Sequence, residues 1–212
     1  MGNILDYKKE YRDLYLPKAE PSVIKVPEMI FAAVEGKGNP NEADGEYQAA
    51  VGVLYGIQYT IKMSKKGASV PEGYFDYVVP PLEGLWWLSN GDDWSPKSKS
   101  KYCWISMIRL PEYINKDVFN WACEEASKKK KINTDKAFLY KFSEGLCVQC
   151  MHTGPYDNEP KTLALMDSYI SGNNLLKDLS EKRRHHEIYL SDPRKTAPEK
   201  MKTVLRVPVK KA

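Results

Sequence analysis

The sequence predicts an α+β fold in which two similar β-α-β-β units form one antiparallel sheet. The first observation is an order of elements that occurs twice, namely strand, Gly/Pro turn, helix, strand, loop, strand. The second is a pair of shared landmarks: Ile-Arg-Leu-Pro at 108–111 matches Leu-Arg-Val-Pro at 205–208, and Asn41-Glu42 matches Asn158-Glu159. Their offset of about one hundred residues indicates an internal duplication. We expect a pseudo-two-fold arrangement with helices on one face of the sheet and a ligand groove on the other.

The elements of the first half follow from hydrophobic periodicity and turn residues. They are a short helix at 6–16, strands at 23–26 and 29–35, a helix from 44 to about 65, and strands at 77–88 and 102–110. Asp44 is expected to cap the long helix. The segment 90–96 is expected to be a loop, because it is too long for a tight hairpin turn.

The second half has the same kinds of signal. Its expected elements are a helix at 116–131, strands at 138–142 and 146–152, a helix at 159–171, and strands at 183–190 and 201–209. We expect residues 1–24 to be a helical extension. Residues 25–212 then form one domain with halves at about 25–111 and 112–212.

Composition excludes several classes of protein. The 212 residues carry a net charge of +4 with acids and bases well mixed, which does not favour nucleic-acid binding. There is no apolar run long enough for a membrane span and no signal-peptide core at the N-terminus. Four cysteines in a chain of this length are read as reduced thiols. We therefore expect a cytoplasmic protein. Five Trp and fourteen Tyr can pack a core or line a pocket.

The strand at 183–190 carries the candidate functional residue. Alternation places His185, Glu187 and Tyr189 on one face, and His186, Ile188 and Leu190 on the other, more apolar face. Glu187 is then a carboxylate between an imidazole and a phenol. The alternative is a solvated sheet face, where most strand glutamates lie.

The chain resembles the GyrI-like small-molecule-binding family over about residues 25 to 210. The resemblance depends on the repeated halves, the turn Thr153-Gly154-Pro155-Tyr156, the strand His186-Glu187-Ile188-Tyr189-Leu190, and the tail from Arg194 to Pro208. Within this family, the chain is similar to a stand-alone bacterial branch whose members hydrolyse cyclopropane-containing, DNA-alkylating natural products. In relatives fused to DNA-binding regulators, an acidic residue at the position of Glu187 receives cationic aromatic drugs. No DNA-binding module is recognisable here.

The resemblance implies a cofactor-independent hydrolase that detoxifies cyclopropanoid compounds. Glu187 would act as general base towards water, and a tyrosine would stabilise the oxygen that gains charge. Tyr55, Tyr156 and Tyr189 are the candidate donors, and Tyr55 is grouped with Glu187 as catalytic. The predicted substrate-binding residues are Trp87, Trp104, Tyr156, Tyr189 and His185. Simple core packing is the alternative for each aromatic residue.

Two other functions stay open. One is a non-catalytic protein that sequesters or senses cationic aromatic compounds, because a carboxylate and ring faces both attract cations. The other, by family analogy alone, is an inhibitor of a topoisomerase. The predicted partner is thus a small hydrophobic aromatic or cationic ligand, with no nucleic acid or membrane, and the protein is expected to be a monomer or dimer.

No metal or cofactor is expected. Cys147 and Cys150 form a single C-x-x-C within a strand, which sends their sulfur atoms to opposite faces. His185 and Glu187 lack an evident third ligand.

Overall fold

The computed structural model describes residues 4–67, 70–89 and 99–212, so the predicted loop at 90–96 lies outside the described residues. The strands are β1 (Ser22–Lys37), β2 (Leu82–Leu88), β3 (Tyr102–Arg109), β4 (Ala137–Thr153), β5 (Leu175–Lys177), β6 (His185–Tyr189) and β7 (Lys202–Lys211). The α-helices are α1 (Tyr7–Glu10), α2 (Arg12–Tyr15), α3 (Glu46–Met63), α4 (Lys116–Lys130) and α5 (Glu159–Gly172). Short 3-10 turns are η1 (Ser64–Lys66), η2 (Lys99–Lys101), η3 (Tyr156–Asn158) and η4 (Pro198–Lys200).

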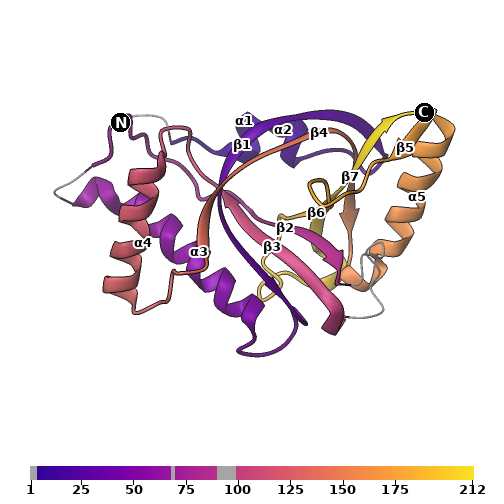
Figure 1. The fold of residues 1–212 in the computed structure, drawn as a ribbon. Coiled ribbons are helices and arrows are strands. Elements are labelled where there is room, and N and C mark those ends of the chain that lie inside the picture. The colour runs from indigo at the N-terminus through magenta and orange to yellow at the C-terminus, as the bar shows by residue number, and fades with distance from the viewer. Residues whose placement is uncertain (1–3, 68–69, 90–98) are drawn as a thin grey trace.

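The strands form an antiparallel sheet in the order β4-β1-β3-β2-β6-β7-β5. A further pairing of β4 with β7 closes six of them into a barrel-like sheet, with β5 added beside β7. Closure matters because it leaves few unpaired backbone groups at exposed strand edges. In Figure 1, α3 and α4 lie together on one side of the sheet strands and α5 lies on the other side of the molecule. The predicted α+β class with an antiparallel sheet is confirmed.

Two predicted pairs of strands are single long strands. The segments at 23–26 and 29–35 belong to β1, and those at 138–142 and 146–152 belong to β4. The breakers between them, Pro27 and Gly145, lie at the same point of the β1–β4 ladder, because Val26 pairs with Gly145. Gly145 has a φ of 73°, which a glycine adopts without strain. Both strands therefore bend at this point and continue.

Helices α3 and α5 pack on the same face of the barrel-like sheet. Tyr47 of α3 contacts Trp104 of β3, whose ring lies so close over Gly36 of β1 that an added Cβ would be 2.3 Å from it. Farther along the same face, Met166 and Ile170 of α5 share a small core with residues of β4 and β7. The central strands β2 and β6 lie between these two packed regions in the sheet order.

Some local predictions were wrong. Asp44 does not cap α3: it has a φ of 57°, and the N-cap is Gly45, without a side-chain hydrogen bond. The predicted N-terminal helix is two single turns, α1 and α2, whose Tyr7, Leu14 and Tyr15 belong to the main core. Strand β5 was not predicted, because its three residues are too few to show a periodicity.

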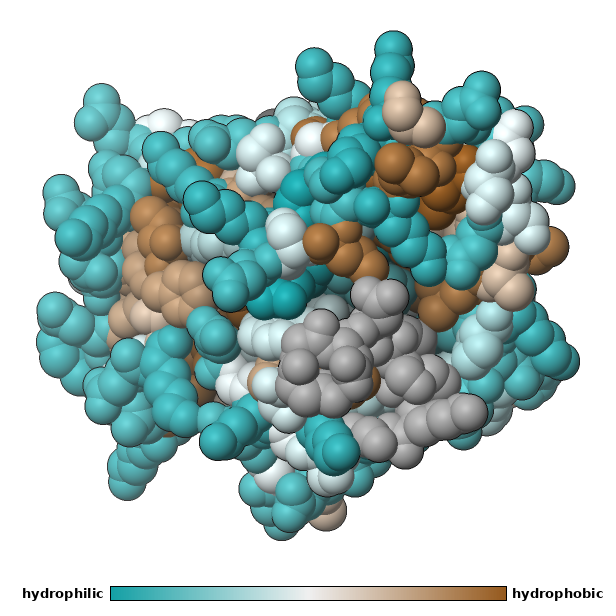
Figure 2. Space-filling model, turned by 45° about the vertical axis from the view of Figure 1, so that its right-hand side comes forward, coloured by the Kyte–Doolittle hydropathy of each residue, from teal (hydrophilic) through white to brown (hydrophobic). Residues whose placement is uncertain are grey.

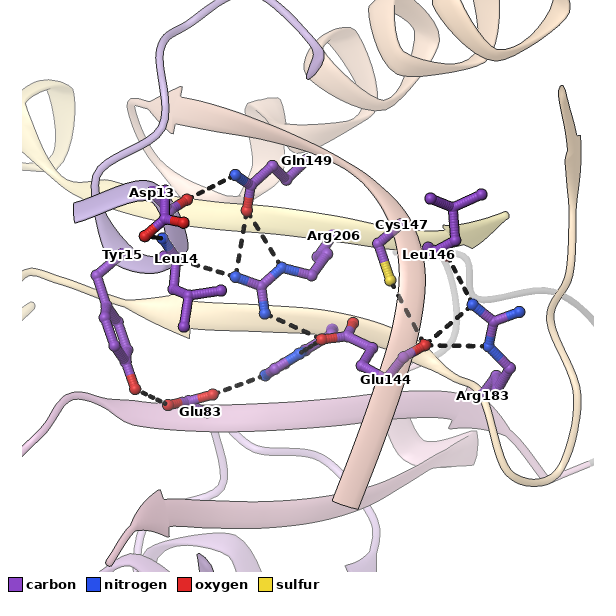
Figure 3. A network of polar contacts seen from close by, with 11 residues as sticks. Asp13, Leu14, Tyr15, Glu83, Glu144, Leu146, Cys147, Gln149, Arg183 and Arg206 are labelled. Carbon is purple, nitrogen blue, oxygen red and sulfur yellow. Dashed lines mark hydrogen bonds and ion pairs between the residues drawn. The ribbon is translucent and has the colours of Figure 1, made fainter. Parts of the chain in front are cut away.

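The face of β6 that carries His186 holds a buried polar network among apolar core residues such as Leu85 and Ile188 (Figure 3). His186 is fully buried, with Nε2 3.0 Å from Glu83 Oε2 and Nδ1 3.0 Å from Glu144 Oε2. Arg206 pairs with the same Glu144 oxygen at 2.9 Å. Glu144 and His186 stabilise each other's charged forms: the pKa of His186 is raised to about 9 and that of Glu144 lowered to about 2, although burial acts in the opposite direction on both.

The N-terminal segment completes this network. The backbone oxygen of Leu14 accepts a 2.7 Å hydrogen bond from Arg206, and that of Asp13 accepts one from Gln149 at 2.7 Å. The Tyr15 hydroxyl donates to Glu83 at 3.4 Å. Residues before β1 therefore supply partners that a buried guanidinium requires.

The outer surface is mostly hydrophilic in the view of Figure 2, with separate hydrophobic patches between polar side chains. Among the residues that the structure describes, no helix has the length and hydrophobicity needed to cross a membrane.

Candidate functional site

Strand β6 places Glu187 on the sheet face that carries the helices. Directly paired residues of an antiparallel ladder point to the same side. Glu187 pairs with Gly84 of β2, and Gly84 pairs with Ser106 of β3. Two residues along the strands, on the same face, Trp86 of β2 pairs with His185 of β6 and with Trp104 of β3. Trp104 packs against α3. The expectation that the carboxylate faces a groove on the side opposite the helices is therefore wrong, because register places Glu187 between α3 and α5.

The carboxylate of Glu187 is held from both sides. The Tyr189 hydroxyl donates to Glu187 Oε2 at 2.7 Å, and His185 Nε2 lies 3.2 Å from Glu187 Oε1. The Trp86 indole N–H in turn donates to the Tyr189 hydroxyl at 2.8 Å. Glu187 is only 6% exposed, so these hydrogen bonds act where water competes weakly. Burial and the charge of Glu187 raise the pKa of Tyr189, which keeps this phenol protonated as a donor.

Gly84 makes room for the chain of hydrogen bonds. A Cβ added at this position would lie 2.6 Å from Trp86 Nε1 and 3.2 Å from the Tyr189 hydroxyl. Such separations do not occur between real atoms of these kinds without movement of the neighbour. A glycine in the interior of a strand often marks a close approach of this kind, so this residue was a signal that the sequence analysis did not use.

Aromatic rings surround the hydrogen-bonded residues. Tyr47 of α3 lies with its ring centroid 5.5 Å from that of Trp86 and 5.1 Å from that of Trp104. Tyr102 lies edge-on to Trp86 at 5.7 Å, and Tyr156 edge-on to Tyr189 at 5.9 Å. These separations are those of favourable aromatic pairs. We call Tyr47, Trp86, Tyr102, Tyr156, His185, Glu187 and Tyr189 the Glu187 cluster.

A second carboxyl group faces this cluster. Glu159, the first residue of α5, is 1% exposed. Burial, followed by the charges of Glu187 and Asp157, raises its pKa well above the ordinary value, which favours the neutral acid. Glu159 in turn contributes to raising the pKa of both Tyr102 and Tyr156 to about 12. In the sequence, Glu159 stands out only as a landmark of the repeat, because its burial depends on the packing of α5 against the sheet.

The structure brings four of the seven predicted residues into this cluster, namely His185, Glu187, Tyr189 and Tyr156. Trp104 lies behind it, fully buried beneath Tyr47. Trp87 lies elsewhere: it follows Trp86 in β2 and so points to the other side, where the Arg184 guanidinium lies 4.6 Å from its ring centroid. The tryptophan beside Glu187 is Trp86, whose indole N–H donates to Tyr189.

Tyr55 lies along α3, two helical turns after Tyr47. Its ring stacks with that of Tyr59, with centroids 6.4 Å apart. Burial raises its pKa, and Tyr59, Asp192 and Arg194 are the further influences. The groups around Tyr55 are thus in α3 and in the turn after β6. The geometry supports Tyr156 more strongly than Tyr55 as a hydroxyl beside Glu187.

The cysteines behave as buried thiols. Cys147 belongs to the main core and Cys150 to the small core beneath α5, so they lie on opposite faces of β4. Burial raises the pKa of both, that of Cys150 to about 11. Within residues 4–67, 70–89 and 99–212, no three His, Cys, Asp or Glu side chains are grouped to hold a metal ion.

Comparison with known proteins identifies the family. The model of the GyrI-like small molecule binding domain matches residues 19–210. The chain belongs to the GyrI-like family. Three crystal structures from Listeria innocua are 47–48% identical to it and have TM-scores of 0.88 to 0.91. They cover 97–98% of this chain and 100% of their own chains; two are described as hydrolases and one as an uncharacterized conserved protein.

A more distant structure shares the fold alone. The EcmrR C-terminal domain is 12% identical, with a TM-score of 0.55 over 91% of this chain and 98% of its own. No curated protein matches the chain by sequence. The family assignment establishes a GyrI-like small-molecule-binding domain.

Proposed function

We propose that this protein is a cofactor-independent hydrolase that opens the activated cyclopropane ring of reactive aromatic compounds and so detoxifies them. The observation that carries the proposal is the buried Glu187 carboxylate, held by Tyr189 and His185 among aromatic rings. The description of two close relatives as hydrolases supports an enzyme.

The reaction requires a base and a hydrogen-bond donor. Glu187 accepts a proton from water as the water oxygen bonds to a cyclopropane carbon. The C–C bond of the ring breaks, and its electron pair moves through the conjugated system to a carbonyl oxygen, which takes up a proton. The products differ from the substrate by one water molecule, and nothing is oxidised or reduced.

The cluster offers a hydroxyl for the oxygen that gains charge. The Tyr189 hydroxyl is already bonded to Glu187, so its role is to orient the base. Tyr156 lies edge-on to Tyr189 and is half-buried. Because the Tyr189 hydroxyl is occupied and Tyr156 lies beside it, we assign Tyr156, which like other tyrosines is protonated at neutral pH, as the donor.

Binding without turnover is the second candidate. Ring faces and a buried carboxylate attract a cationic aromatic compound without any chemistry, and Trp86 and Glu187 provide both. The family name, a small molecule binding domain, is consistent with this role.

The test is incubation of catalytic amounts of protein with a neutral aromatic cyclopropane activated by a conjugated carbonyl, in water labelled with ¹⁸O. Mass spectrometry should show a product that carries one labelled oxygen, in many-fold excess over the protein. Protection of the compound in a one-to-one ratio without product would support the binding protein and contradict the enzyme.

A further inference from the structure

Glu159 is a buried acid that packing does not explain. It lies at the N-terminus of the 14-residue helix α5, yet its side chain is shielded from water. Among the described residues its Oε1 atom has no hydrogen-bond partner. A buried carboxyl oxygen without a partner costs stability, and for Glu159 no cation contact is present among the described residues to offset that cost.

The groups around Glu159 belong to the Glu187 cluster. Tyr156 of η3, the turn that leads directly into Glu159, lies edge-on to Tyr189 with ring centroids 5.9 Å apart, so the start of α5 packs against this cluster. The charges that act on Glu159 are those of Glu187 in β6 and Asp157 in η3. Asp157 is exposed and its carboxylate lies 3.5 Å from Lys99 of η2. Glu159 in turn acts on Tyr102, Tyr156 and Tyr189, so tyrosines from three elements lie within its electrostatic reach.

Glu144 provides a comparison within the same chain. It is also 1% exposed, but His186 and Arg206 contact its carboxylate at 3.0 and 2.9 Å. These cations hold the pKa of Glu144 at about 2, whereas the neighbours of Glu159 are anions and phenols. With equal burial, the surroundings thus favour the charged carboxylate in Glu144 and the neutral acid in Glu159.

We propose that Glu159 is the acid of this site: it delivers the proton that the substrate's carbonyl oxygen takes up, while Glu187 receives the proton from water. The inference rests on the proposed hydrolase. Tyr156 can donate a hydrogen bond to that oxygen, but a carboxylic acid gives up its proton far more readily than a phenol. Two carboxyl groups whose environments differ commonly divide the acid and base roles in this way.

The proton balance is complete. One turnover leaves Glu187 protonated and Glu159 ionised, and transfer of that proton from Glu187 to Glu159, directly or through water, restores the starting state. The assignment also defines the substrate class. The compound must present an oxygen towards the N-terminus of α5 and its electrophilic carbon towards β6, and it must be neutral or cationic to enter beside Glu187.

The kinetic test compares Glu159→Gln with Glu42→Gln, using the activated cyclopropane as substrate. Glu42 is the exposed counterpart of Glu159 in the sequence repeat and serves as the control. In Glu159→Gln, kcat should fall by about 10²- to 10⁴-fold, the usual contribution of a general acid. The decline of wild-type kcat at high pH, where Glu159 loses its proton, should disappear. If Glu159 had only a structural role, its substitution would not change the pH dependence of kcat. Unchanged kcat and profile in Glu159→Gln, with loss of turnover in Glu187→Gln, would overturn the inference and leave the hydrolase standing.

A second measurement requires no substrate. Glutamate carboxyl carbons labelled with ¹³C are titrated by NMR, and the Glu159 signal is identified by its absence in Glu159→Gln. Its midpoint should lie well above that of the other glutamates and should fall in Glu187→Gln, which lacks the neighbouring charge. A midpoint in the ordinary range would overturn the inference whether or not the protein is a hydrolase. If the wild type produces no water adduct, the proposed function and this catalytic role fail together.

Discussion

The hydroxyl of Tyr189 donates a 2.7 Å hydrogen bond to Oε2 of Glu187, two residues earlier on the same strand face. The Trp86 indole N–H donates to that hydroxyl from the neighbouring strand. Trp86 therefore orients the Tyr189 hydroxyl, and this hydroxyl in turn fixes one carboxylate oxygen of Glu187. Such a network holds the carboxylate in position before a ligand arrives, which is what the proposed role of Glu187 as general base requires.

Gly84→Ala tests whether this chain needs the space beside it. The added methyl group would meet Trp86 Nε1 at 2.6 Å and force the indole away from Tyr189. We expect a loss of about 1–3 kcal/mol in the free energy of unfolding, which is typical of overpacking, and weaker turnover or binding. Gly52→Ala is the matched control, because Gly52 lies on the exposed side of α3 with nothing within 4 Å. It should stabilise the protein by about 0.4–1 kcal/mol in urea denaturation. Equal effects of the two substitutions would contradict the close packing at Gly84.

Trp86→Phe and Trp87→Phe distinguish the two adjacent tryptophans. Trp86→Phe removes the donor to Tyr189, whereas Trp87 points to the other side of β2 beneath Arg184. We expect kcat to fall by about 10²-fold in Trp86→Phe, the cost of a misplaced catalytic group, and to change by less than about twofold in Trp87→Phe. If the protein only binds, ligand affinity should show the same contrast. A larger effect of Trp87→Phe than of Trp86→Phe would mean that the ligand lies on the opposite face of β2.

The pH dependence of stability tests the network around His186. Its raised pKa means that protonated His186 contributes stability fully below its ordinary pKa of 6.5, and that this contribution is lost as pH rises through about 9. The lowered pKa of Glu144 gives a contribution that is complete above 4.5 and lost as pH falls through about 2. The network's contribution should thus be greatest between about pH 4.5 and 6.5.

His186→Gln isolates that effect. It leaves the buried carboxylates of Glu83 and Glu144 without the imidazolium between them. Breaking a buried pair by removal of one partner costs about 3–5 kcal/mol. Urea denaturation at several pH values should show this loss at pH 6 and a smaller dependence on pH between 6.5 and 9 than in the wild type. The same slope in both proteins over that range would contradict a charged His186.

Sequence patterns predicted elements more accurately than their environments. Period-two alternation placed His186 and Ile188 on a buried face of β6, and both are fully or almost fully buried. It could not reveal that the partners of His186 are Glu83 and Glu144, because these come from strands 40 to 100 residues away. The strand breaks predicted at Pro27 and Gly145 were wrong for a related reason, since two breakers that meet in one ladder allow a shared bend. The pseudo-two-fold relation of the two halves stays a prediction.

Local sequence patterns group the central residues of the Glu187 cluster but not those at its margins. Glu187, His185 and Tyr189 come from one strand, so local alternation was sufficient to group them. Trp86, Gly84 and Glu159 depend on strand register and on the position of α5, which no local pattern specifies. Of these, Gly84 alone carried a local signal, as a glycine in the interior of a strand pattern.

The most direct test of the account is turnover and ligand binding measured together on Glu187→Gln. The amide keeps the shape of the carboxylate but cannot take a proton from water. Turnover of the neutral activated cyclopropane should fall by about two to four orders of magnitude while its binding is retained. A loss of affinity for cationic compounds alone, in a protein without turnover, would indicate the binding function. If Glu187→Gln turns over and binds both kinds of compound as the wild type does, Glu187 is not the centre of the site.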